Sequence, residues 1–288
     1  MSSPLAVGAR ARRRWTTALV YAAVAPFVLF ALFPFYYMVV TSLKGDPELY
    51  DLDAVPYWVG QGLTFQHYRF LLVDTLFLRW FANTVFVSVL TVLVSVTFGI
   101  LAAYAVARLR FRGVATFGVG IFITYLVPPA LLFIPLAIIV TRLGVADTPW
   151  ALILTYPTFL VPFNTWLLMG YFRTIPREIE ECAMIDGCGR LQALVRVVLP
   201  VALPGIVCAI LFSFTFSWNE FLYALVFVSS GDNKTITVGV TSELIRGDIY
   251  FWGSLMAGGI VGTLPIVLVY VFFLDYYVRG LTGGAVKG

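Results

Sequence analysis

Residues 81–107, FANTVFVSVLTVLVSVTFGILAAYAVA, decide the fold class because this long stretch contains no charged side chain. A helix needs about 20 predominantly apolar residues to cross the hydrocarbon core of a bilayer. None of the apolar stretches alternates apolar and polar residues in the manner of membrane-barrel strands. The sequence therefore predicts an all-α, polytopic membrane protein. Its six predicted transmembrane helices cover approximately residues 17–40, 81–107, 114–141, 149–172, 204–228 and 252–278.

The composition of the whole chain points to the same class. Of 288 residues, 60% are hydrophobic and 12% are charged, whereas a soluble domain has roughly 25% charged residues. The mean hydropathy is +0.92. A water-soluble enzyme of this length could not bury so much apolar surface and is excluded. Three cysteines, with none in an extended outer loop, argue against a disulfide scaffold.

Basic residues are distributed unequally between the two sides of the predicted spans. Of the 19 Lys and Arg residues, thirteen lie in segments on the side of the N-terminus. Because cytoplasmic segments carry the excess of positive charge, both termini are expected in the cytoplasm. The expected organisation is a tail (1–16), a six-span domain (17–278) and a second tail (279–288). Outer loops are expected at 41–80 and 229–251, and the main cytoplasmic loop at 174–200.

The cytoplasmic loop, TIPREIEECAMIDGCGRLQALVRVVLP over residues 174–200, interrupts the apolar pattern with acids and bases. Thr174 and Pro176 are typical of a helix start, since a hydroxyl caps the first turn and proline suits its first positions. Asp186-Gly187 favours a break, because glycine easily adopts a left-handed conformation. The loop is therefore predicted to form a short helix, a turn and a second short helix along the inner face of the membrane.

The spacing within this loop resembles the EAA loop of bacterial ABC-importer permeases. That pattern reads Glu-Ala-Ala, three residues, Gly, nine residues, Ile, any residue and Leu-Pro. Here Glu181 and Ala183 are followed by Gly187 and then by Val197-Val198-Leu199-Pro200. Cys182 replaces one alanine and valine replaces the isoleucine, and both replacements are small or isosteric.

Other segments resemble the carbohydrate-importer branch of that family, particularly the maltose-type second permease. The resemblance covers nearly the whole chain. It includes the Ile-Pro-Arg-Glu and Ile-Asp-Gly runs of the cytoplasmic loop, Trp218-Asn219-Glu220-Phe221 in the fifth span, and Gly284–Gly288.

The resemblance implies the fold of a type I ABC importer permease and a coupling role for the cytoplasmic loop. In the family, the loop docks as a knob into a cleft on a cytoplasmic ATPase subunit. The alternative is an ordinary amphipathic helix resting on the lipid surface, but such a helix would carry Lys and Arg beside a strong apolar face. The residues expected to couple to the ATPase are Glu181, Ala183, Ile185, Asp186, Gly187, Leu199 and Pro200.

No catalytic or cofactor-binding pattern is found in the sequence. The three lysines are not part of a Gly-x-x-x-x-Gly-Lys-Ser/Thr phosphate loop, and the single histidine, His67, is expected to be structural. The chain is therefore expected to be a non-catalytic subunit without metal or cofactor. ATP and Mg²⁺ would be bound by a partner ATPase.

Polar residues in the fifth predicted span are candidates for the substrate pathway. Glu220 would lie roughly 6 Å from the bilayer centre at about 1.5 Å rise per residue. A charged side chain facing lipid there would cost about 2.5–3.5 kcal/mol. It should therefore face an aqueous cavity, pair with another chain or be protonated, unless such residues serve only to join helices. The candidate residues are Trp218, Asn219, Glu220 and Tyr223.

These features favour a permease subunit of an ATP-driven, binding-protein-dependent sugar importer in a bacterial cytoplasmic (inner) membrane. The resemblance implies four kinds of partner: a second permease, an ATPase dimer, an extracytoplasmic sugar-binding protein and the carbohydrate itself. The alternative is a secondary transporter driven by an ion gradient, which would favour repeated halves and intramembrane charge pairs. A membrane-embedded hydrolase is disfavoured because catalytic sets are missing.

Overall fold

The computed structural model describes the backbone of residues 4–282 and the side chains of residues 15–274 and 276. The side chains of Arg10, Arg12, Arg13 and Arg14, which are among the thirteen basic residues counted on the side of the N-terminus, lie outside these ranges. The run Gly284–Gly288, which is part of the family resemblance, also lies outside them. The chain divides into two compact units. Unit 1 comprises Met1–Asp74 and Leu244–Val261, and unit 2 comprises Thr75–Glu243 and Gly262–Gly288.

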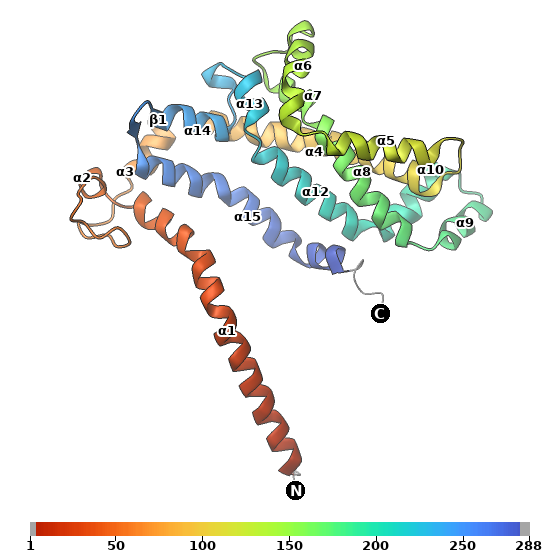
Figure 1. Cartoon of the computed structure of the whole chain (residues 1–288), viewed down its shortest axis with the longest axis horizontal. Helices are drawn as coiled ribbons and strands as arrows, with labels where there is room; N and C mark the ends of the chain where they lie inside the picture. Colours follow the sequence, from red (N-terminus) through yellow and green to blue (C-terminus); the bar gives the residue numbers. More distant parts are fainter. Residues whose placement is uncertain (1–3, 283–288) are drawn as a thin grey trace. The chain divides into compact units, whose positions relative to one another are not determined.

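Unit 1 is built on the long helix α1, Pro4–Ser42, which continues well beyond the predicted first span (Figure 1). The most apolar part of its stretch Trp15–Ser42 contains no buried residue. So large an exposed apolar surface requires lipid or another subunit as its neighbour. The remaining elements of unit 1 are short: α2 (Asp46–Leu49), α3 (Gln66–Arg69), the π-turn η1 (Phe70–Asp74), the antiparallel strands β1 (Ile245–Arg246) and β2 (Ile249–Tyr250), and the start of α15 (Trp252–Thr282).

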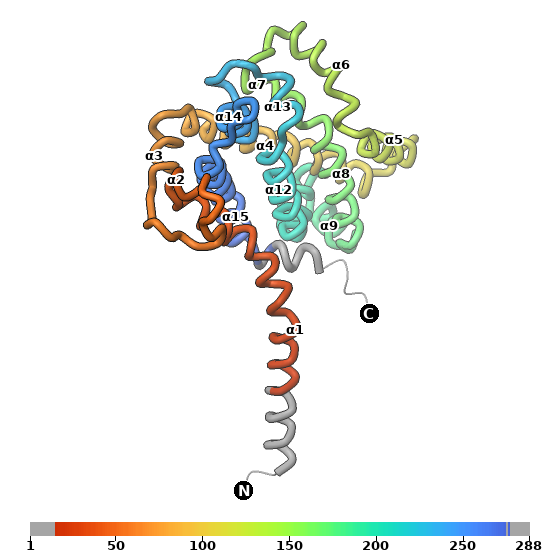
Figure 2. Tube along the Cα trace, turned by 60° about the vertical axis from the view of Figure 1, so that its left-hand side comes forward, coloured from red at the N-terminus to blue at the C-terminus, as the bar shows by residue number. Residues whose placement is uncertain are grey.

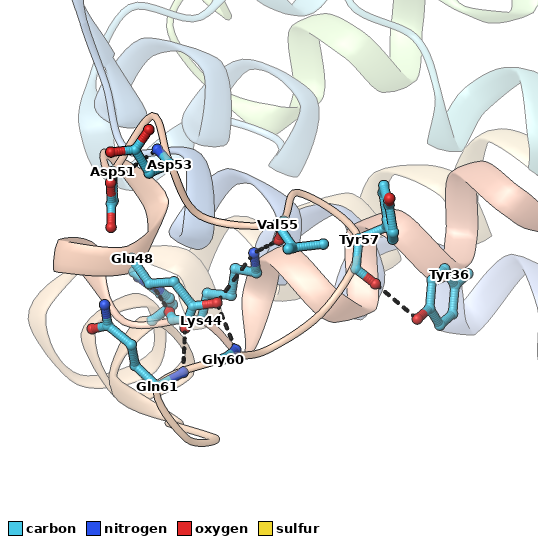
Figure 3. A network of polar contacts seen from close by, with 10 residues as sticks. Tyr36, Lys44, Glu48, Asp51, Asp53, Val55, Tyr57, Gly60 and Gln61 are labelled. Atoms are coloured by element: carbon cyan, nitrogen blue, oxygen red, sulfur yellow. Dashed lines mark hydrogen bonds and ion pairs between the residues drawn. The ribbon is translucent and has the colours of Figure 1, made fainter.

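A buried ion pair organises the predicted outer loop 41–80 (Figure 3). The Nζ of Lys44 lies 3.2 Å from Oε1 of Glu48 and donates to the carbonyl of Val55 at 2.5 Å. The same carboxylate accepts the backbone N–H groups of Gly60 and Gln61 at 2.8 and 3.0 Å. These backbone hydrogen bonds, led by that of Gly60, hold the pKa of Glu48 below its ordinary value although burial opposes them. The loop is therefore a closed, ordered structure.

Unit 2 has a core of three helices, α4, α8 and α12, which pack against one another. Close approach is possible because Gly99 of α4 has no side chain: a Cβ there would lie 2.5 Å from Cβ of Asn164 in α8. Asn164 also accepts a hydrogen bond from Ser213 of α12 at 2.9 Å, which ties the three helices together. The elements of unit 2 outside the cytoplasmic loop are α4 (Phe77–Arg108), α5 (Val114–Leu126), α6 (Pro129–Arg142), α7 (Pro149–Thr155), α8 (Pro157–Thr174), α12 (Leu203–Trp218), α13 (Leu222–Phe227), η3 (Gly231–Asn233), α14 (Ile236–Leu244) and the rest of α15.

Four helical segments match predicted spans: Trp15–Ser42, Phe77–Arg108, Pro149–Thr174 and Trp252–Leu274. Of these, Pro149–Thr174 consists of α7 and α8, which adjoin at Tyr156. The third predicted span is instead bent by 95° between α5 and α6 (Figure 2). The bend follows from Pro128 and Pro129, because each lacks an N–H donor and the residue before a proline avoids the helical region. The six-span count holds if each bent pair is one span.

The fifth predicted span, 204–228, is not one helix, and the expectation of a continuous span was wrong. Helix α12 ends at Trp218 and the separate helix α13 begins at Leu222. The bend of 82° lies before α12, where the helical segment Arg190–Val201 meets it. Glu220 is therefore located in a break between two helices.

The predicted outer loop 229–251 contains regular secondary structure. It contains η3, α14 and the β1–β2 hairpin. The polar run 229–233 is held by Asp147, whose Oδ1 accepts the N–H groups of Ser229 and Ser230 at 2.8 and 2.7 Å. Its Oδ2 accepts the Ser230 hydroxyl, and its backbone carbonyl accepts Nδ2 of Asn233. These hydrogen bonds fix residues 229–233 against Asp147.

Candidate functional site

The loop 174–200, predicted to be cytoplasmic, has the expected helix–turn–helix form. Helix α9 covers Arg177–Ile185, and the second helical segment consists of α10 (Arg190–Ala193), η2 (Leu194–Val198) and α11 (Leu199–Val201). The expected cap was wrong: the hydroxyl of Thr174 donates back to the carbonyl of Tyr171 at 2.8 Å. Thr174 thus ends α8, because Ile175 precedes a proline and is extended, with ψ of 129°.

The turn between the two helices is exposed. Gly187 has φ of +92°, and a Cβ added there would meet nothing within 4 Å. Its N–H donates to Met184, and the next N–H, that of Cys188, donates to Ala183 at 3.0 Å, which closes the end of α9. Ile185 is 84% exposed, an unusual position for an isoleucine. Glu181, Ile185, Asp186 and Gly187 are therefore together on an exposed tip, with Ala183 partly buried behind them.

A buried polar cluster anchors the base of this loop, and sequence reasoning missed it. Glu180 is buried, accepts a hydrogen bond from the Tyr104 hydroxyl and has Oε2 3.7 Å from Nε of Arg108. Arg108 in turn donates to the carbonyl of Ile175 at 2.8 Å. Arg177 adds a hydrogen bond to the carbonyl of Ala107 at 3.2 Å. Tyr104 and Arg108 are four residues apart and so share one face of α4, which is the only signal that the sequence offered.

Leu199 and Pro200 do not lie at the tip. Leu199 packs against a buried cluster that includes Leu168, Phe172, Leu194 and Val198. Both residues belong to α11, just before the bend into α12. The predicted coupling residues thus fall into two places: the exposed tip, and the connection before α12, where Leu199 packs and Pro200 is exposed.

A second candidate site lies at the break in the fifth span. Glu220 borders a cavity of about 400 Å³ whose other walls are apolar and largely aromatic. Its carboxylate also caps α13: Oε1 accepts the N–H of Tyr223 at 2.8 Å and Oε2 that of Ala224 at 3.0 Å. The sequence expectation was an aqueous cavity, another chain or protonation; capping by backbone donors was not foreseen. The other lining residues are Tyr125, Val127, Pro129, Phe159, Leu160, Phe163 and Phe216.

The other three candidate pathway residues are placed differently. Trp218 is buried and donates through Nε1 to the carbonyl of Gly262 at 3.0 Å. Tyr223 is buried and donates through its hydroxyl to the carbonyl of Pro129 at 2.9 Å. Asn219 is exposed and donates to the carbonyl of Thr215. None of the three borders the cavity, so the structure brings only Glu220 of the four to it.

Comparison with known proteins identifies the family. The model of the family described as "Binding-protein-dependent transport system inner membrane component" matches residues 95–283. The chain belongs to this family. It is 40% identical to the inner membrane ABC transporter permease protein YcjP of Escherichia coli, over 93% of this chain and 95% of that protein. It is 34% identical to the trehalose/maltose transport system permease protein MalG of Thermococcus litoralis, over 90% and 93% of the two chains.

A further relative and a solved structure agree with this assignment. The diacetylchitobiose uptake system permease protein DasC of Streptomyces coelicolor is 32% identical, over 89% of this chain and 92% of that protein. The crystal structure of a bacterial ABC transporter involved in alginate import contains a chain of the same fold, with a TM-score of 0.78 and 23% identity. That likeness covers 96% of this chain and 99% of the other. The resemblance to carbohydrate ABC-importer permeases, drawn above from the loop motif, is confirmed.

Proposed function

We propose that this chain is one of two permease subunits of an ATP-driven, binding-protein-dependent sugar importer and forms half of its translocation pathway. The curated relatives carry names of trehalose, maltose and diacetylchitobiose transport systems, which supports the sugar class. The exposed apolar surface of α1 and the open cavity beside Glu220 are consistent with a second permease as neighbour. The subunit itself is non-catalytic, and an ATPase dimer binds ATP and Mg²⁺.

The observation that carries the proposal is the form of the loop 174–200. A rigid base, in which Glu180 bonds Tyr104 and Arg108, supports an exposed tip at Ile185 and Gly187. A stiff projection transmits displacement, whereas a flexible one would absorb it. The tip has apolar and acidic groups suited to a cleft on an ATPase subunit. In this arrangement the loop and both termini lie in the cytoplasm of a bacterium, and the outer loops meet an extracytoplasmic sugar-binding protein.

The experiment compares two isoleucines on α9 after purification of the tagged chain with its co-purifying subunits. Ile185 is 84% exposed and Ile179 is 42% exposed. Because neither side chain is buried in the core, replacement by Asp is expected to leave the fold intact. Ile185→Asp is expected to reduce ATPase co-purification and sugar uptake, because it places a charge in the docked cleft. Ile179→Asp is expected to leave both near the wild-type level.

Two results would contradict the proposal. Transport by the purified chain in the absence of any ATPase subunit would indicate a secondary transporter. Normal uptake and normal ATPase retention in Ile185→Asp, with the variant correctly inserted, would show that the tip is not the docking element.

A further inference from the structure

Two hollows meet on the surface of unit 2. They lie beside the helices α4, α5 and α8, which contact one another. The first, the basic hollow, has a volume of about 630 Å³ and lies at the α4–α5 connection. Four arginines line it together with apolar side chains, and no acidic residue does. These arginines are Arg110, Arg112, Arg173 and Arg177.

The second, the apolar hollow, continues from the first between the helices. It has a volume of about 360 Å³ and shares Val106, Val114 and Arg173 with the basic hollow. The rest of its wall is apolar: Ala115, Gly118, Val119, Phe122, Trp166 and Met169. The basic hollow therefore opens directly into the apolar hollow.

Within the described residues, the arginines of the basic hollow form no ion pair, although Arg110 and Arg177 also border a hollow that contains Glu180 and Glu181. Arg110, Arg112 and Arg173 are exposed. Arg177 uses one guanidinium nitrogen for the carbonyl of Ala107. Trp166 offers a ligand a hydrogen-bond donor, since its Nε1 is buried and has no hydrogen-bond partner in the described part of the chain.

We propose that the two hollows form one binding site for an anionic phospholipid. The phosphate of the headgroup lies among the arginines, because a guanidinium matches phosphate oxygens in charge and in bidentate geometry. An acyl chain lies in the apolar hollow against Phe122 and Met169. A free phosphate would bind in the basic hollow but leave the apolar hollow empty. A zwitterionic lipid would fill the apolar hollow but lacks the net negative charge that would balance the arginines.

The site adjoins the base of the loop 174–200. Arg173 is in the last turn of α8, and Arg177 begins α9. A lipid bound to both, and to the connection after α4, would contact three elements around the base of the loop 174–200. The inference goes beyond the transport function proposed above, and its test does not depend on that function.

The first arm of the test removes headgroup contacts. The purified full-length chain with its co-purifying subunits is titrated with phosphatidylglycerol or phosphatidylcholine, and bound lipid is counted by native mass spectrometry. Arg110→Gln combined with Arg112→Gln is expected to weaken phosphatidylglycerol binding about 30-fold, from the usual contribution of two basic residues at an anionic surface. Arg142→Gln combined with Arg196→Gln removes the same charge away from the hollows and is expected to leave binding unchanged.

The second arm fills the groove. A Cβ at Gly118 would lie 3.1 Å from Cγ1 of Val106, whereas a Cβ at Gly120 would meet nothing within 4 Å. Gly118→Leu is expected to reduce phosphatidylglycerol binding, and Gly120→Leu, on the same helix, is not. Circular dichroism and gel filtration check that both variants keep the fold.

Three outcomes would overturn the proposal. One is equal binding of phosphatidylcholine, which indicates unselective lipid contact. Another is unchanged phosphatidylglycerol binding in both the double arginine variant and Gly118→Leu. The third is displacement of the lipid by millimolar inorganic phosphate, which indicates a site for a soluble anion.

Discussion

Glu180 holds the base of the loop 174–200 through the groups to which it bonds. Its carboxylate is the acceptor for the Tyr104 hydroxyl and the counter-charge of Arg108, and all three residues are buried. The neighbouring Glu181 is exposed and belongs to the tip. Two adjacent glutamates thus have different roles, and only the fold distinguishes them.

Glu180→Ala is expected to destabilise the protein by about 3 kcal/mol, because it leaves the buried guanidinium of Arg108 without its counter-charge. Glu181→Ala, a matched change one residue away, is expected to change stability by less than about 0.5 kcal/mol. The measurement is the thermal unfolding midpoint of the purified protein in detergent. Equal midpoints for the two variants would remove the anchoring role from Glu180.

Asp147 acts in a similar way on the predicted outer loop 229–251. The hydroxyl and N–H of Ser230, followed by the N–H of Ser229, hold the pKa of Asp147 below its ordinary value, although desolvation opposes them. Asp147 also has φ of +57°, a conformation that Asn tolerates nearly as well. The carboxylate can therefore be neutralised without strain on the backbone.

The order of residues 229–233 is expected to depend on that charge. A carboxyl group with a lowered pKa in the folded state stabilises it above the unfolded pKa of about 3.9 and loses this effect as the pH falls through the folded value. Wild-type protection of the Ser229 and Ser230 amides against hydrogen exchange should therefore persist at neutral pH and fall only below about pH 4. Asp147→Asn should lower it already at pH 7, whereas Asp232→Asn, which changes an exposed carboxylate in the same turn, should not. Full protection in Asp147→Asn would contradict the assignment.

At the scale of elements, the sequence predicts the existence of helices better than their interruptions. The third and fifth predicted spans are apolar throughout most of their length, and hydropathy does not register a break in the backbone. Pro128-Pro129 could have suggested the bend after α5, but prolines at other positions, such as Pro26 and Pro34, lie inside α1. After Trp218, the carboxylate of Glu220 accepts the N–H groups of the residues three and four positions further on, a local capping contact that hydropathy also does not register.

The break at Glu220 allows a test that separates capping from substrate contact. Glu220→Ala leaves the N–H groups of Tyr223 and Ala224 without their acceptor and is expected to cost about 1–3 kcal/mol. Glu220→Gln retains one acceptor oxygen and should lie between this variant and the wild type. The KM of sugar uptake and the unfolding midpoint are measured for each variant. If Glu220 contacts sugar, Glu220→Gln should impair uptake more than its loss of stability explains. Uptake that follows stability in both variants would restrict Glu220 to capping.

At the scale of the whole molecule, composition and loop spacing were enough to predict the membrane class, the helical fold and the family. They could not predict the buried anchor at Glu180, because its partners are about 75 residues away in the sequence, at Tyr104 and Arg108. The positions of Trp218 and Tyr223 could not be predicted from the sequence either, because an aromatic residue with a polar group suits a sugar site and a helix interface equally.

The orientation of the chain in the membrane remains a prediction from charge, and the native cysteines provide the means to check it. Cys182 is exposed on α9, whereas Cys208 is buried in α12. A membrane-impermeant maleimide should therefore label Cys182 in inverted vesicles and not in intact cells from which the outer wall is removed.

A second variant reports on the opposite side of the membrane. Leu52, in the predicted outer loop 41–80, is 100% exposed and is replaced by Cys in a background in which Cys182 and Cys188 are changed to Ser. Labelling of that variant from the outside together with Cys182 from the inside fixes the topology, because the first span separates the outer loop from the N-terminus. Labelling of Cys182 in the intact cells would reverse the chain in the membrane and, with it, move the coupling loop away from any cytoplasmic ATPase.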